Sequence, residues 1–166
     1  MDTRQAVSGA LFLAAAGLLV VTLLFPGLFV GDPGSYERVT VTAVDANGTD
    51  LATVEARVAD TDTKRRVGLS ETDSLAPDEG MLFVHAEESR HAYVMSGPRE
   101  EMSFPLDIVF LDANGTVTTI HHAAVDAGGQ FAGRAKYVLE VERGWANRTG
   151  LDVGDTVVVP EGLEAQ

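Results

Sequence analysis

The chain has 166 residues and a formal net charge of −13, which comes from 25 acidic and 12 basic residues. A chain of this length, less its apolar N-terminus, has room for one hydrophobic core and therefore for one domain. The acidic excess disfavours nucleic-acid binding, because it repels phosphates, and it is typical of proteins from salt-adapted hosts. Disulfides, thiolate metal sites and cysteine nucleophiles are excluded because the chain has no cysteine.

The N-terminal segment is apolar and long enough to cross a membrane. Residues 6–25 contain no charged side chain, and at about 1.5 Å per residue a helix of this length spans the roughly 30 Å hydrocarbon core of a bilayer. We therefore expect a single transmembrane anchor or signal-anchor within residues 1–31 and a linker over residues 32–38. The alternative is a cleaved signal peptide, whose apolar region is usually shorter.

Two features favour a domain that lies outside the cell. Arg4 stands with the amino terminus on one side of the apolar segment, which weakly places that side in the cytoplasm. All three asparagines, Asn47, Asn114 and Asn147, lie in Asn-x-Thr triplets, the acceptor pattern for N-glycosylation. However, Asn-Gly is also the preferred pair of a type I′ hairpin turn, which explains Asn47 and Asn114 without any glycan.

Beyond the linker, alternating apolar and polar residues predict strands. We expect eight of them, over residues 38–46, 51–60, 80–86, 90–96, 106–112, 116–124, 136–142 and 155–160. So many strands in a short domain favour a closed or nearly closed sheet, since open edges invite aggregation. The predicted fold class is mainly β, a compact β-barrel or sandwich over residues 39–163 with one or two short helices.

Two segments have helical character. Residues 61–75 predict a short helix with Thr61 or Asp62 as its N-cap and Gly68 near its end. Residues 143–150 predict a turn or a second short helix. The glycine-rich residues 126–135 predict a flexible connection.

Several short motifs follow one another in a recognisable order: Gly68-Leu69, Gly80-Met81-Leu82-Phe83, Met95, "PLDIVF" from Pro105, Leu139-Glu140-Val141, Gly144 and Gly154-Asp155. Over about residues 50–160 this order resembles domain of unknown function family 192, whose bacterial and archaeal members are commonly exported or membrane-anchored. The resemblance implies a β-rich barrel or sandwich with a small helical element, and no agreed reaction. Where the family usually has "FWM" close to "PLD", this chain has "YVM" and an insertion, so a pocket shaped by that aromatic pair is altered here.

Three residues are candidates for ligand binding by their setting. Asp107 begins a strongly apolar strand, where a carboxylate must find hydrogen-bond donors or shift its pKa. The alternative is a structural role in which it accepts N–H bonds from the preceding loop. Glu140 also has two interpretations: it belongs to a buried site, or it lies on the solvent-exposed face of its strand. Trp145, the only tryptophan, either contacts a ligand or caps the core.

Tyr93 and Met95, in the altered "YVM" motif, complete the candidate ligand-binding set, with the glycine-rich loop from Gly128 to Gly133 as a further contact region. An apolar strand position also suits Met95 as core filler.

A metal site is an alternative. His85, His91 and His121 lie close in sequence to His122 and to all the internal methionines, and imidazole with thioether ligands suits copper, or imidazole alone zinc. His121 and His122 are adjacent on a strand and should point to opposite faces, so only one of them can join a given site. No other cofactor is expected.

An enzyme is the remaining alternative. Asp107, Glu140 and a histidine could supply a general acid and base for a hydrolase-type reaction, with Ser70 or Ser103 as nucleophile. The sequence has no nucleophile elbow, phosphate-binding glycine loop or HExxH motif. It therefore favours a membrane-anchored, extracytoplasmic module with a binding or structural role, whose protein, glycan or small-molecule partner is not identified.

Overall fold

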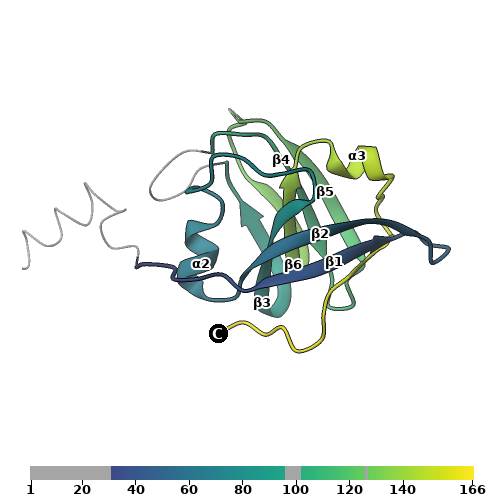
Figure 1. Cartoon of the computed structure of the whole chain (residues 1–166), viewed down its shortest axis with the longest axis horizontal. Helices are drawn as coiled ribbons and strands as arrows, with labels where there is room; N and C mark the ends of the chain where they lie inside the picture. The colour runs from purple at the N-terminus through teal and green to yellow at the C-terminus, as the bar shows by residue number, and fades with distance from the viewer. Residues whose placement is uncertain (1–30, 96–101, 126) are drawn as a thin grey trace, which may run out of the picture. The chain divides into compact units, whose positions relative to one another are not determined.

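A single curled sheet organises the chain (Figure 1). In the computed structural model, which describes residues 31–95, 102–125 and 127–166, seven strands pair in the order β5-β4-β6-β3-β2-β1-β7. The strands are β1 (Arg38–Val44), β2 (Asp50–Ala59), β3 (Glu79–Tyr93), β4 (Leu106–Leu111), β5 (Val117–Ala123), β6 (Phe131–Glu142) and β7 (Thr156–Val158). The described residues also form two short helices, α2 (Asp62–Val67) and α3 (Trp145–Thr149), which lie at opposite ends of the sheet in Figure 1.

The sheet curls until its two edges meet. All neighbouring strands are antiparallel except β2 and β3, which are parallel and are joined through α2. At one edge β7 pairs with β1. The chain around β7 also bonds to the other edge, because Val117 N–H donates to Asp155 O and Val157 N–H donates to Gly115 O, each at 2.8 Å. The mainly β prediction is confirmed, and the architecture is a half-barrel linked across its open side.

Both "DANGT" segments form the same hairpin turn. The N–H of Gly48 donates to Asp45 O, and that of Gly115 donates to Asp112 O, at 3.0 and 3.1 Å. The two glycines have φ of +85° and +83°, whereas no described residue other than glycine has a positive φ. The predicted type I′ turn is therefore wrong, since it needs positive φ at Asn47 as well. These are type I turns that end in a left-handed glycine.

The first predicted helix and its N-cap are confirmed, but α2 ends at Val67 and residues 69–75 of the predicted stretch are not helical. Thr61 is the N-cap of α2, and its hydroxyl accepts a hydrogen bond from Lys64 N–H at 3.2 Å. The C-cap of the helix is Gly68, whose φ of +53° suits glycine. The second helical prediction, over residues 143–150, is confirmed by α3.

Two strand boundaries differ from the prediction. The strands expected over residues 80–86 and 90–96 are one long strand, β3, with a bulge between Val84 and Ser89, so the sheet has seven strands instead of eight. The predicted flexible connection is wrong from Phe131 onward, because β6 begins there. Gly133 in this segment lets the ring of Phe110 pack directly against the backbone of β6, since a Cβ on Gly133 would lie 2.6 Å from Cγ of Phe110.

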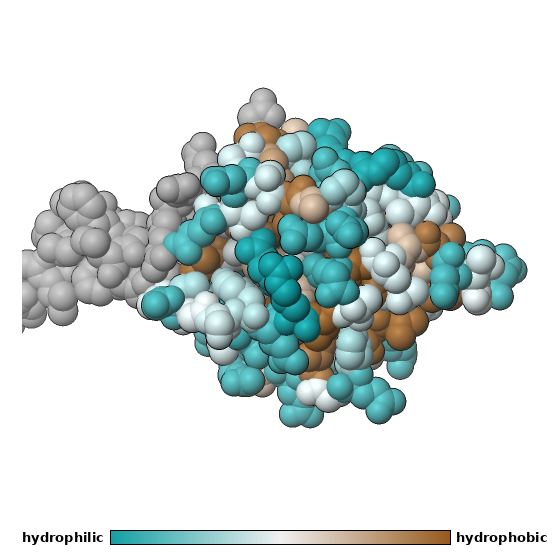
Figure 2. Space-filling model, in the orientation of Figure 1, coloured by the Kyte–Doolittle hydropathy of each residue, from teal (hydrophilic) through white to brown (hydrophobic). Residues whose placement is uncertain are grey.

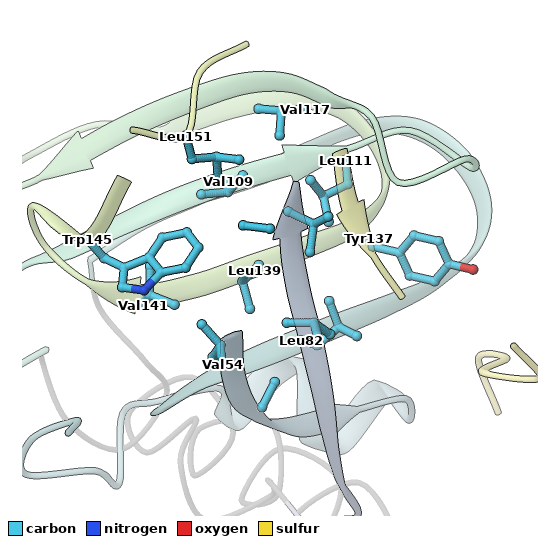
Figure 3. Close-up of a cluster of buried hydrophobic side chains, with 14 of the residues drawn as sticks. Val54, Leu82, Val109, Leu111, Val117, Tyr137, Leu139, Val141, Trp145 and Leu151 are labelled. Carbon is cyan, nitrogen blue, oxygen red and sulfur yellow. The ribbon is translucent and has the colours of Figure 1, made fainter. Parts of the chain in front are cut away.

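Both faces of the sheet are buried. The interior core lies within the curl, where Figure 3 shows Leu82, Leu139, Val141 and Trp145 among its side chains. The helix-side core covers the other face and includes Met81, Phe83, Leu106, Ile108 and Phe110, packed against the residues that follow α2. Every residue of β4 is buried as a result.

Hydrophilic side chains cover most of the face seen in Figure 2, with smaller hydrophobic areas between them. The large hydrophobic side chains exposed among the described residues are four valines: Val94, Val125, Val153 and Val158. Scattered exposed valines are ordinary for a soluble surface.

The close packing of Phe110 on β6 predicts a strong effect for Gly133→Val. The new side chain would overlap the buried Phe110 ring, and overpacking of this kind costs about 2 kcal/mol in free energy of unfolding. The matched control is Gly128→Ala, because a Cβ there meets no atom within 4 Å. Denaturant titration should show a lower midpoint for Gly133→Val alone, and equal midpoints would mean that the ring moves aside freely.

Candidate functional site

A pocket of about 400 Å³ opens on the helix-side face of the sheet. Residues 65–70, from α2 and the turn after it, form one wall, and residues 91–94 at the end of β3 form another. Phe83, His85, Met102, Leu106 and Glu140 complete the lining. The pocket thus joins α2, the end of β3 and the last part of β6.

Glu140 is the acidic residue of this pocket. Its side chain lies on the helix-side face, where its partners across the sheet are Met81 and Ile108, and the residue is only 6% exposed. The alternative that Glu140 is solvent-exposed is wrong, because the chain between β2 and β3 covers this face. Burial in apolar surroundings raises the pKa of Glu140 to about 8. No hydrogen bond or ion pair within the described residues reaches its carboxyl group, which is therefore free to meet a ligand.

A tyrosine and two histidines line the pocket together with Glu140. The hydroxyl of Tyr93 and Nε2 of His85 share a hydrogen bond of 3.0 Å, and the rings of His85 and His91 stack at 3.5 Å between centroids. Burial lowers the pKa of His85 to about 4, with smaller contributions from His91 and Arg65. Burial also raises the pKa of Tyr93, and the negative charge of Glu140 adds to this. At neutral pH these side chains are uncharged.

The bulge in β3 brings the two histidines together. Pairing with β6 runs regularly from Gly80 to Val84 and resumes at Ser89, so that the four intervening residues of β3 oppose only Lys136. A regular strand would hold residues six apart at roughly 20 Å. The extra residues turn the strand and let His85 stack on His91, as bulges near functional sites often do.

Two arginines of α2 line the rim. Arg65 is held in place, since its Nη1 donates to the carbonyls of Asp60 and Val84 and its Nη2 bonds to Asp62 at 2.6 Å. Arg66 is exposed and forms no hydrogen bond or ion pair with any described residue. The rim therefore carries positive charge in a strongly acidic protein.

Asp107 lies on the opposite face of the sheet from Glu140. It is fully buried, and its Oδ2 accepts hydrogen bonds from the N–H groups of Gly144 and Ala146, each at 3.0 Å. Its Oδ1 lies 2.6 Å from Nδ1 of His122. This geometry matches the structural alternative for Asp107, in which its carboxyl accepts backbone N–H bonds. The donors, however, come from the start of α3 and not from the preceding loop. Asp107 and Glu140 do not share a site.

Among the five predicted ligand-binding residues, only Tyr93 and Glu140 line the pocket. Trp145 is buried in the interior core, as the core-capping alternative predicts, and Met95 is buried in the helix-side core. The glycine-rich loop does not line the pocket either. Ligand binding by Tyr93 and Glu140 stays a prediction.

The histidines do not form one cluster. His121 contacts the rings of Phe110 and Phe131 on the helix-side face, whereas His122 bonds to Asp107 on the interior face, so their opposite directions are confirmed. Across residues 31–95, 102–125 and 127–166, no three His, Cys, Asp or Glu side chains come close enough to hold a metal ion.

The two candidate nucleophiles have backbone partners. The hydroxyl of Ser70 donates to Val67 O at 2.7 Å, and that of Ser103 lies 3.2 Å from Asp73 O. Ser70 lines the pocket but is buried. Neither hydroxyl bonds to a described histidine.

Residues 42–159 match the model of DUF192, a family described as "Uncharacterized ACR". This match covers more than half of the chain. The chain belongs to the DUF192 family. No curated protein matches it.

Two solved structures of bacterial proteins are similar to this member of DUF192. One, from Sinorhizobium meliloti 1021 and described as a candidate transcription regulator, is 29% identical, with 77% of this chain and 97% of that chain covered and a TM-score of 0.67. The other is a protein of unknown function from Novosphingobium aromaticivorans DSM 12444, 25% identical, with 78% and 91% covered and a TM-score of 0.67. The TM-scores show that both of these proteins share the fold of this chain.

No helix among the described residues is long and apolar enough to cross a membrane. The expected anchor falls almost wholly within residues 1–30, which lie outside the described residues. All three sequon asparagines, Asn47, Asn114 and Asn147, are exposed.

Proposed function

We propose that this domain is a small-ligand-binding module whose site is the pocket over Glu140. The observation that carries the proposal is the buried carboxyl of Glu140, which faces the pocket and has no partner in the described part of the chain. A ligand in the pocket can supply the hydrogen bonds that no described residue gives to this carboxyl group, in surroundings largely removed from water. The volume of about 400 Å³ lies within the range of small-molecule sites.

A hydrolase-type activity is the second candidate. A carboxyl with a pKa of about 8 can hold or release a proton near neutral pH, as a general acid or base must. Because Asp107 lies on the other face of the sheet, such chemistry would rest on Glu140 with Tyr93 and His85. Binding stands ahead of it, since neither Ser70 nor Ser103 is paired with a described histidine.

The location proposed for this module is the outer face of the cell membrane, with the domain tethered by a single N-terminal helix. The uncharged residues 6–25 support the tether. The exposure of Asn47, Asn114 and Asn147 supports glycan attachment, which would fix the domain outside.

Native mass spectrometry of the full-length protein from its own host tests the proposed ligand binding and the proposed location. The wild type and Glu142→Gln are expected to carry the same co-purifying small molecule, and Glu140→Leu is expected to lose at least about 90% of it. Glu142 is a suitable control because it lies on the same strand and its ion pair with Arg148 is exposed. Equal occupancy in all three variants, or a bare mass in all three, would contradict the ligand-binding role, and attached hexose masses would establish the topology.

A further inference from the structure

The rim of the pocket offers an unused cation. Arg66 has no partner among the described residues, and Arg65 lies beside it on α2 with its guanidinium already oriented by backbone carbonyls. Guanidinium groups bind carboxylates with paired, charge-assisted hydrogen bonds. Of the described residues that line the pocket, Glu140 is the single acid, although Arg65 already forms an ion pair with the exposed carboxylate of Asp62.

The floor of the pocket offers an uncharged hydrogen-bonding group. The other titratable groups of the described pocket lining are Tyr93, His85 and His91 of β3 and Arg65 and Arg66 of α2, and none of them is negative. With its pKa at about 8, Glu140 is protonated at neutral pH. A protonated carboxyl both donates and accepts a hydrogen bond, which suits a hydroxyl or carbonyl oxygen. A protonated Glu140 also adds no negative charge that would repel an anion at the rim.

Between rim and floor the walls are apolar or aromatic. Phe83, Tyr93, Met102 and Leu106 form them, so that the middle of a ligand would be buried against carbon atoms. An organic cation fits this pocket less well, because it would approach two arginines and would require Glu140 to ionise in an apolar setting.

From this arrangement we infer that the pocket takes a small organic carboxylate with an apolar or aromatic body and a hydroxyl or carbonyl oxygen at its far end. The carboxylate binds at Arg66, with Arg65 beside it, and the far oxygen bonds to Glu140. This inference rests on the proposed ligand-binding function and names the chemical class of the ligand.

Four matched probes test the inference on the full-length protein at pH 6.5, with dissociation constants measured by calorimetry or ligand-observed NMR. The probes are 4-hydroxymethylbenzoate, 4-methylbenzoate without the hydroxyl, 4-methylbenzyl alcohol without the carboxylate, and 4-methylbenzylamine with a cation. The first should bind most tightly. Loss of the carboxylate should weaken binding about tenfold in the wild type but not in Arg66→Gln. Loss of the hydroxyl should weaken binding about fivefold in the wild type but not in Glu140→Leu.

The variants separate two kinds of failure. Glu140→Gln, which keeps a donor and an acceptor, should retain the preference for the hydroxyl. Tighter binding of the alcohol or the amine than of the carboxylates would overturn the ligand class, while the pocket role would stand if Glu140→Leu still removes the co-purifying molecule. Absence of binding by all four probes at millimolar concentration would also overturn the class. A co-purifying molecule insensitive to Glu140→Leu would instead overturn the pocket role itself.

Discussion

Burial of Glu140 is expected to lower the free energy of unfolding of the wild type by about 5 kcal/mol between pH 4.5 and about 8. The variant Glu140→Leu is expected to lack this decrease. In the unfolded chain the carboxyl of Glu140 ionises near its ordinary pKa of 4.5, whereas burial holds the folded-state pKa at about 8. Between these values the unfolded state binds fewer protons than the folded state, so stability decreases as the pH rises. The penalty is absent below pH 4.5 and complete above pH 8.

Denaturant unfolding at pH 4, 6, 7.5 and 9 measures this effect. The fluorescence of Trp145 is a suitable signal, because it is the only tryptophan and is 3% exposed in the interior core. Glu142→Gln, with its exposed ion pair, should follow the wild-type profile. If the stability difference between Glu140→Leu and the wild type were the same at pH 4 and pH 9, then Glu140 would not be buried as described.

Local patterns in the sequence were sufficient for most of the secondary structure. Period-two alternation located the strands, and the Thr61 cap with Gly68 located α2, because both signals depend on residues close in the chain. Alternation predicts two strands where the structure has the long β3, since a bulge interrupts alternation as a turn does. Asn-Gly does not determine the turn type, because the pair suits both a type I′ turn, in which it occupies the two central positions, and a type I turn whose last residue is a left-handed glycine.

The burial of Glu140 could not be predicted in the same way. Alternation assigns Glu140 to one face of β6, but it does not say what covers that face. The cover comes from the crossover between the parallel strands β2 and β3, and that pairing is a long-range property of the fold. The charged "KRR" run at residues 64–66 predicts only part of a helix, yet two of its members form the rim of the pocket.

The stacking of His85 on His91 could not be predicted from the sequence either, because the bulge that creates it has no sequence signature stronger than the charged "AEES" segment between them. Asp107 shows the opposite case. An acid at the start of an apolar strand must be paired, and only the identity of its partners, at the start of α3 and on β5, required the structure.

Asp107→Ala is expected to lower the free energy of unfolding by about 4 kcal/mol. The substitution removes a fully buried carboxyl that accepts two backbone N–H bonds, from Gly144 and Ala146, and one bond from His122. The two N–H groups have no replacement acceptor in the described structure around α3. Their loss should also loosen Trp145, the first residue of that helix, and shift its emission to longer wavelength in the native state.

The comparison with His122→Ala identifies which bonds matter. That variant removes only the contact between Oδ1 of Asp107 and a half-exposed ring, so the expected loss is about 1 kcal/mol. Asp107→Asn keeps an acceptor of the same size and should fall between the two alanine variants. Denaturant midpoints give the three values on one scale. A loss for Asp107→Ala no larger than that for His122→Ala would show that water takes over the N–H groups of α3, and that the helix does not depend on this carboxyl.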